Sequence, residues 1–151
     1  MNNKIVWTVI AIVLVIFGAF ALSSDNEKEN DEVDANQSLS LSDIHGLEVD
    51  INDSDRLYLP NHQGLYVQGA DGTISKIGEI SDDFMGFSVS PTDNNVFFAS
   101  GHPRTGGNFG LIKSVDGGVN WQDLSDGLNG PVDFHTMAVD SKNDDYIYGY
   151  Y

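Results

Sequence analysis

All four histidines of the chain occupy two positions of a pattern that recurs at intervals of 40 and 50 residues. His45 and His135 share the first position, where the unit between them has Met85. His62 lies 17 residues after His45, and His102 lies 17 residues after Met85, so these two share the second position. Neutral imidazoles combined with carboxylates suit zinc and related divalent ions. The histidines are therefore the first candidates for a chemical role.

An aspartate stands two residues before each first position: Asp43, Asp83 and Asp133. Residues i and i−2 of a strand share a face, so each aspartate could orient its own histidine. If the two positions lie at the start and end of an antiparallel hairpin, they meet at one end of it. We expect all seven residues on a single face, as a site for a divalent metal, an anion or a sugar. The alternative is that they are strand-end and turn residues that stabilise each unit.

The elements that must position these side chains form an internal repeat. Residues 43–59, 83–99 and 133–149 align without a gap, and in each an alternating apolar stretch, a polar turn and a second apolar stretch predict a β-hairpin. Residues 64–67 and 110–113 begin a further pair of strands. Four short strands in each period of 40 to 50 residues indicate a propeller blade, whereas a β-sandwich has no reason to repeat its sequence. We expect two four-stranded antiparallel sheets and a final hairpin, without a long helix.

One turn carries a specific motif. Residues 114–121, SVDGGVNW, match the pattern S-x-D-x-G-x-x-W, which is the Asp-box. Asp116 can accept hydrogen bonds from the backbone of the turn, the glycines can adopt positive φ, and Trp121 can pack against the sheet. Ser114, Asp116, Gly118 and Trp121 are thus expected to be structural. The corresponding turn of the first unit, residues 70–74, lacks the tryptophan.

With the Asp-box, the HGLEVD unit (45–50), the SGHP stretch (100–103) and the FHTMAVD unit (134–140), residues 43–151 resemble the BNR/Asp-box β-propellers. That group includes sialidase-like, sortilin-like and photosystem-assembly-factor-like proteins, and the chain is most similar to an exported bacterial branch named glycosylhydrolase-like. The resemblance implies blades from about residues 43, 83 and 133, the third incomplete, and hence a fragment of about two and a half blades.

The resemblance implies a fold more than an activity, because such repeats occur in enzymes and in binding proteins. Sialidase residues cannot be assigned here, since the chain has only Arg56 and Arg104 and no FRIP-like motif. Arg104, in a glycine-rich loop, is a candidate contact for a ligand carboxylate, although exposed loop arginines are usually only solvated. A catalytic carboxylate pair cannot be chosen among 23 acidic residues without geometry.

The first 42 residues predict export. Residues 5–22 form an 18-residue run without charge, about 27 Å long as a helix, which is enough to cross a bilayer. We expect residues 1–22 to be a signal anchor, with cleavage after Ala21 as the alternative, and Lys4 favours an outward-facing remainder. Residues 23–42 are polar and acidic and predict a disordered linker. The expected location is the cell membrane with an extracytoplasmic domain, or secretion if cleavage occurs.

Charge and composition exclude several classes of protein. The formal net charge is −16 and the few basic residues are scattered, which excludes nucleic acid as a partner. The absence of cysteine excludes disulfides, thiolate metal sites and a lipid-modified cysteine. The sequence therefore predicts an exported, membrane-anchored propeller that binds a carbohydrate or protein ligand, with a divalent metal as the conceivable cofactor. The alternative is a glycoside hydrolase-like enzyme acting on extracellular carbohydrate.

Overall fold

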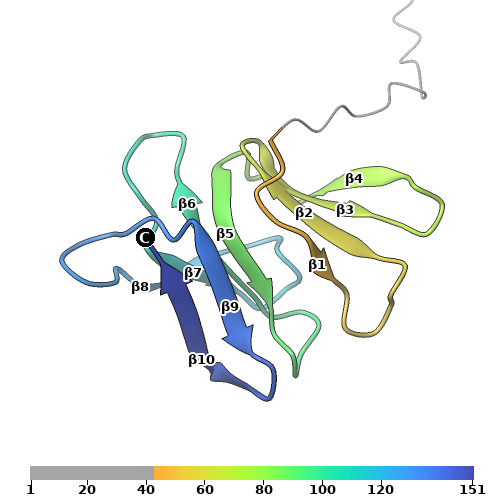
Figure 1. The fold of residues 1–151 in the computed structure, drawn as a ribbon. Coiled ribbons are helices and arrows are strands. Elements are labelled where there is room, and N and C mark those ends of the chain that lie inside the picture. Colours follow the sequence, from red (N-terminus) through yellow and green to blue (C-terminus); the bar gives the residue numbers. More distant parts are fainter. Residues whose placement is uncertain (1–42) are drawn as a thin grey trace, which may run out of the picture. The chain divides into compact units, whose positions relative to one another are not determined.

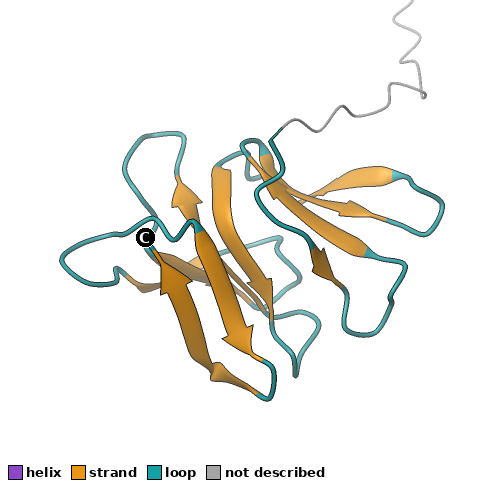
Figure 2. Ribbon diagram, in the orientation of Figure 1, coloured by secondary structure: helices purple, strands orange, loops and turns teal. Residues whose placement is uncertain are grey.

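The computed structural model describes residues 43–151, and this part of the chain consists of strands and loops, as Figure 2 shows. A search of the same residues for a helix long and apolar enough to cross a membrane finds none. The predicted signal anchor and acidic linker, residues 1–22 and 23–42, lie outside the described residues.

Within residues 43–151, ten strands form two four-stranded sheets and a hairpin, all antiparallel. The first sheet contains β1 (Glu48–Val49), β2 (Leu57–Asn61), β3 (Gly64–Gln68) and β4 (Ile74–Ile77). The second sheet contains β5 (Asp83–Val89), β6 (Phe97–His102), β7 (Leu111–Ser114) and β8 (Gln122–Ser125). The final hairpin contains β9 (Thr136–Asp140) and β10 (Asn143–Tyr150). This confirms the predicted all-β architecture of sheets and hairpin, and it is consistent with part of a propeller.

Strand β5 lies between the first sheet and the final hairpin, and it contacts β1 and β2 on one side and β9 on the other (Figure 1). The first strands of the second and third units, β5 and β9, thus contact each other, and β5 also contacts the first sheet. Residues at the start of β5 are therefore placed to reach side chains of the first sheet. The candidate site accordingly combines residues from both sheets.

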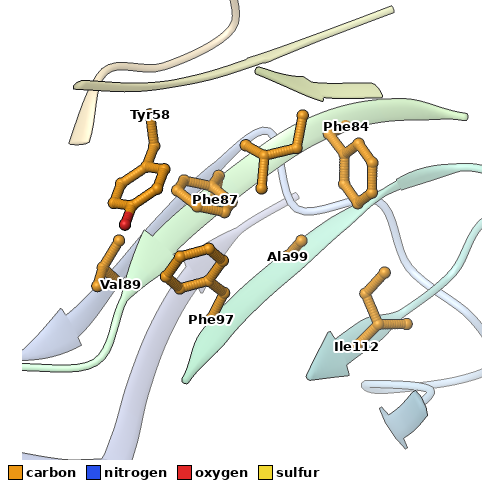
Figure 3. Packing of buried hydrophobic residues seen from close by; sticks show 8 residues of the cluster. Tyr58, Phe84, Phe87, Val89, Phe97, Ala99 and Ile112 are labelled. Carbon is orange, nitrogen blue, oxygen red and sulfur yellow. The ribbon is translucent and has the colours of Figure 1, made fainter. Parts of the chain in front are cut away.

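An aromatic cluster packs the first sheet against the second (Figure 3). The ring of Tyr58 lies 4.8 Å from that of Phe97, and Phe87 lies 5.4 Å from Phe97 between ring centroids. Both pairs meet edge to face, an arrangement that adds to the free energy of burying apolar area. The other buried members of the cluster are Leu65, Phe84, Val89, Ala99 and Ile112.

Both faces of β6 are covered. Phe97 and Ala99 belong to the cluster shared with the first sheet, whereas Val96 and Phe98 pack with Met137 of the final hairpin. Successive side chains of a strand point to opposite faces, so residues 96–99 supply apolar groups to two interfaces. This explains the uninterrupted sequence VFFA, which is typical of a strand buried on both sides.

The turn between β7 and β8, residues 114–121, is closed by its own polar side chains. Ser114 Oγ accepts a hydrogen bond from the backbone N–H of Gly118 at 2.9 Å. The Asp116 carboxylate accepts from the backbone N–H and from the side-chain amide of Asn120, at 2.9 and 2.7 Å. These bonds lower the pKa of Asp116 to about 2. Asp116 is thus ionised over the whole neutral pH range, and its carboxylate holds the turn by these hydrogen bonds.

The same turn also contacts the first sheet. Gly118 has a φ of 90°, and a Cβ there would lie 2.7 Å from Leu65 Cδ2, so glycine is required both by the backbone and by the close approach. Trp121 donates its indole N–H to the Gly118 carbonyl at 3.0 Å, and its ring lies 5.1 Å from that of Phe84. The tryptophan therefore joins the turn to the core.

Turns between the first and second strands link neighbouring units. Asp50 is 4% exposed and accepts hydrogen bonds from Tyr58 Oη at 2.7 Å and from Asn94 Nδ2 of the second sheet at 2.9 Å. One unit later, Ser90 donates to Asp144 of the final hairpin at 2.9 Å. Ser90 aligns with Asp50, and Asp144 aligns with Asn94. We call each of these two linked pairs, Asp50 with Asn94 and Ser90 with Asp144, a turn clamp.

Candidate imidazole and carboxylate site

The backbone of the first unit brings His45 and His62 together. The N–H of His45 donates to the Pro60 carbonyl at 3.0 Å, which fixes the segment before β1 to the end of β2. His62 is the first residue of the two-residue turn between β2 and β3. The two rings lie 4.4 Å apart, with His45 Nε2 3.3 Å from His62 Nδ1. The hairpin argument from the sequence anticipated this pairing.

Asp83 reaches these two rings from the second sheet. Its Oδ2 lies 2.8 Å from His62 Nδ1, and its Oδ1 lies 3.5 Å from His45 Nε2. One atom from each of the three residues falls within 4.8 Å of the others, which is the spacing of a metal-binding group. We call these three residues the first cluster.

Backbone geometry at the start of β5 sets the position of Asp83. Asp83 pairs with His102 across β5 and β6, and the neighbouring residue on β6 is Gly101. Gly101 has a φ of 145°, and a Cβ there would lie 2.0 Å from the Asp83 carbonyl oxygen. Only glycine lets the strands approach closely enough to hold Asp83 against the first sheet.

A second cluster forms around Asp133, where Oδ2 lies 3.1 Å from His102 Nε2 and 2.7 Å from His135 Nε2. The other ring nitrogen of His102, Nδ1, donates to the Gly107 carbonyl at 3.1 Å. Burial lowers the pKa of His102, but the bond to Gly107 and the charges of Asp133 and Asp83 raise it by more, so the net shift is upward. Both ring nitrogens thus face acceptors, which favours the cationic imidazolium.

The seven candidates therefore form two clusters and leave one residue aside. Asp83 contacts histidines of the preceding unit rather than the residue two positions after it, which is Met85. Asp133 contacts its own His135 as well as His102. Asp43 is exposed, with a φ of 59°, and makes no ion pair with a histidine among residues 43–151.

Arg104 lies exposed in its loop, where its backbone N–H donates to Asp82 Oδ1 at 2.8 Å. The structure thus places this arginine on a surface loop, apart from the ion pairs that hold the two clusters.

A pocket of about 180 Å³ lies between the first-strand regions of the three units. His45, Met85 and His135, which share one repeat position, all line it. It is smaller than the roughly 300–1,000 Å³ of typical drug-sized ligand sites. A single polar group, such as one sugar ring or one side chain of a larger ligand, is the size of occupant that it suits.

Glu48 also lines this pocket, and the sequence analysis did not single it out. Burial raises the pKa of the Glu48 carboxyl, and a hydrogen bond with Ser88 offsets this only in part. The sequence did contain one signal for Glu48, which is its difference from the equivalent positions of the other two units. Those positions hold Ser88 and Ala138, and neither residue is charged.

Replacing Glu48 by glutamine tests this environment. The pKa of Glu48 is raised above its usual 4.5. The Glu48 carboxyl group therefore contributes to the stability of the folded state below pH 4.5, and this contribution is lost as pH rises through the folded pKa. The melting temperature of Glu48→Gln should exceed that of wild type by an amount that grows from about pH 4 to about pH 7. Asp71→Asn is the control of opposite sign, because bonds with Thr73 lower the pKa of Asp71. A difference for Glu48→Gln that is independent of pH would contradict the prediction.

Comparisons with known proteins support the fold. No protein-family model and no curated protein sequence matches the chain. The chain is similar to the crystal structure of an ancestral GH74 enzyme, with a TM-score of 0.53 and 16% identity over 70% of this chain and 16% of that one. It is also similar to the GH74 xyloglucanase from Xanthomonas campestris, with a TM-score of 0.47 and 21% identity over 63% of this chain and 18% of that one.

The chain thus spans less than a fifth of the length of either enzyme. At 16% identity the likeness to the ancestral GH74 enzyme concerns the fold alone, and it supports a propeller glycosidase-like fold for residues 43–151. The imidazole and carboxylate clusters must therefore be interpreted from their own geometry.

Proposed function

We propose that this chain is an exported, membrane-anchored ligand-binding module of an Asp-box propeller. Residues 1–22 would anchor it, or cleavage after Ala21 would remove residues 1–21. The observation that carries the proposal is the pocket between the first-strand regions, whose lining includes one histidine from each cluster, His45 and His135. Such groups donate and accept hydrogen bonds, so they suit hydroxyl-rich carbohydrate or the polar side chains of a protein.

The pocket favours binding over hydrolysis. Glycoside hydrolysis normally needs two carboxyl groups on either side of the scissile bond, about 5 to 10 Å apart. Among the residues that line the pocket, Glu48 is the one carboxylic acid. A glycoside hydrolase-like enzyme acting on extracellular carbohydrate is the second candidate, and the observation in its favour is the glycosidase-like fold.

A pocket-filling variant tests the proposal. Thr136 is exposed at the start of β9 and lines the pocket, so Thr136→Arg should obstruct it. The matched control is Ser75→Arg, which adds the same charge at an exposed position of β4. Binding of the full chain in detergent to soluble cello-, xylo- and chito-oligosaccharides is measured by calorimetry, and reducing ends are assayed in parallel.

We expect wild type and Ser75→Arg to bind one of these oligosaccharide classes, and Thr136→Arg to bind it at least about tenfold more weakly, a loss of about 1.4 kcal/mol. Reducing ends should not accumulate. Their release by wild type would establish the hydrolase instead. Equal binding by both arginine variants would remove the pocket from the proposal, and binding of no oligosaccharide would refute carbohydrate as the ligand.

A further inference from the structure

We infer that His45, His62 and Asp83 form a binding site for one divalent transition-metal ion of the zinc type. The inference rests on the proposed function only in that the ion would lie beside the same pocket. Its evidence is the geometry of the first cluster, which is independent of what the pocket binds.

The distances in the first cluster match those between ligands of a tetrahedral ion. Nitrogen and oxygen ligands lie about 2.0–2.1 Å from zinc, so two ligands of a tetrahedral ion lie about 3.3 Å from each other. His45 Nε2 is 3.3 Å from His62 Nδ1 and 3.5 Å from Asp83 Oδ1. The three side chains come from two sheets, yet they already have the spacing that a shared ion requires.

Hydrogen bonds among His45, His62 and Asp83 do not satisfy all of the ring nitrogens and carboxylate oxygens of the first cluster. His62 Nδ1 faces both His45 Nε2 at 3.3 Å and Asp83 Oδ2 at 2.8 Å, and a single N–H can serve only one of them. Asp83 Oδ1 is buried and has no hydrogen-bond partner among the residues that the structure describes. A buried oxygen without a partner is costly. A cation bound to both rings and to this oxygen removes both deficits.

Three protein ligands leave the fourth position of a tetrahedral ion open, as in zinc sites that bind a substrate or water. His45 belongs both to the cluster and to the pocket lining, so an occupant of the pocket is placed to supply the fourth ligand. An oxygen donor, such as a sugar hydroxyl or a carboxylate, fits that role.

The repeat explains why one unit interface has this site and the next does not. The residues equivalent to His45, His62 and Asp83 are Met85, His102 and Asp133. Met85 offers a thioether, which is not among the thiolate, imidazole and carboxylate groups that bind zinc in proteins. Around Asp133, His102 and His135 approach the same oxygen, Oδ2, which is the arrangement of two ion pairs rather than of three ligands around an ion.

Exchanging the residue types at the equivalent positions 45 and 85, by His45→Met and by Met85→His, provides a reciprocal test. The full chain, purified in detergent without a histidine tag and stripped with a chelator, is titrated with Zn²⁺ or Co²⁺ while bound metal, Co²⁺ absorption and melting temperature are measured. Wild type should bind about one ion, with a rise in melting temperature. His45→Met should weaken binding at least about 100-fold. Met85→His should bind about two ions, since it completes the equivalent set.

His135→Ala is the control, because it removes a histidine outside the first cluster and should leave one ion bound. Wild type that binds no ion would overturn the inference, and so would His45→Met that binds as tightly as wild type. His62→Ala provides a second ligand variant if His45→Met fails to fold. The result is separate from the proposed function, because oligosaccharide binding by the metal-free chain would uphold that function while the metal site failed.

Discussion

Asp50→Ala is expected to destabilise the folded domain by about 3–5 kcal/mol, because it removes the buried acceptor of a turn clamp. The substitution leaves the Tyr58 hydroxyl and the Asn94 amide without their partner at the junction of two sheets. Two backbone N–H groups of the turn, those of Asn52 and Asp53, also lose the acceptor. Denaturant unfolding of the full chain in mild detergent, followed by circular dichroism, measures the loss.

Two pKa values give this variant a signature beyond stability. Burial raises the pKa of Asp50, but the bonds from Tyr58 and Asn94 lower it by more, so stability from Asp50 is present above pH 3.8 and is lost as pH falls. Burial, followed by the bond to Asp50, raises the pKa of Tyr58 to about 12. Ultraviolet titration should show this tyrosine ionising at lower pH in Asp50→Ala. Asp53→Ala, at an exposed turn position, should cost less than about 1 kcal/mol, and an equal loss would contradict the network.

Phe97→Ala is expected to cost about 3–5 kcal/mol through the cavity left between the two sheets. The side chain is fully buried, and its ring contacts Tyr58 of the first sheet and Phe87 of its own sheet. Phe97→Leu, which retains most of the volume, should cost clearly less. The same denaturant unfolding measures both variants. Val115→Ala, at a 58% exposed position, is the control and should change stability by no more than about 0.5 kcal/mol.

A loss below about 1 kcal/mol for Phe97→Ala would mean that the sheets do not depend on this ring. The aromatic contacts between Tyr58 and the second sheet would then be incidental. A loss that appears as a separate, earlier unfolding transition would show that the two sheets unfold independently.

The sequence predicted the contacts within one hairpin in detail, whereas between hairpins it predicted only that the histidines and aspartates would share one face. Alternating apolar residues and polar turns placed the strands, and the hairpin geometry correctly anticipated that His45 and His62 meet. The pairing of Asp83 with these rings was not anticipated. The sequence argument was that residues two positions apart share a face, and it considers a single strand only. Asp83 is drawn to the preceding unit by the stacking of the sheets and by the conformation of Gly101, which no local pattern encodes.

The role of Glu48 in the pocket was missed for a similar reason. Its neighbours Leu47 and Val49 fit the alternation of a strand, and an acidic residue between them would be expected to face solvent. Burial between the first-strand regions appears only once three units are assembled. Comparison of equivalent repeat positions, where Ser88 and Ala138 replace the acid, was the one signal that could have identified it.

The turn clamps have a consequence for assembly. They occupy equivalent positions but differ in chemistry, since Asp50 pairs with Asn94 whereas Ser90 pairs with Asp144. A final hairpin stacked in error on the first sheet would bring Asp144 to Asp50, and two carboxylates would repel each other where an amide should donate. Similar repeats are prone to docking on the wrong neighbour during folding. The two clamps therefore favour the correct neighbouring unit over an incorrect one. Units of similar sequence can thus stack in the order in which they occur along the chain.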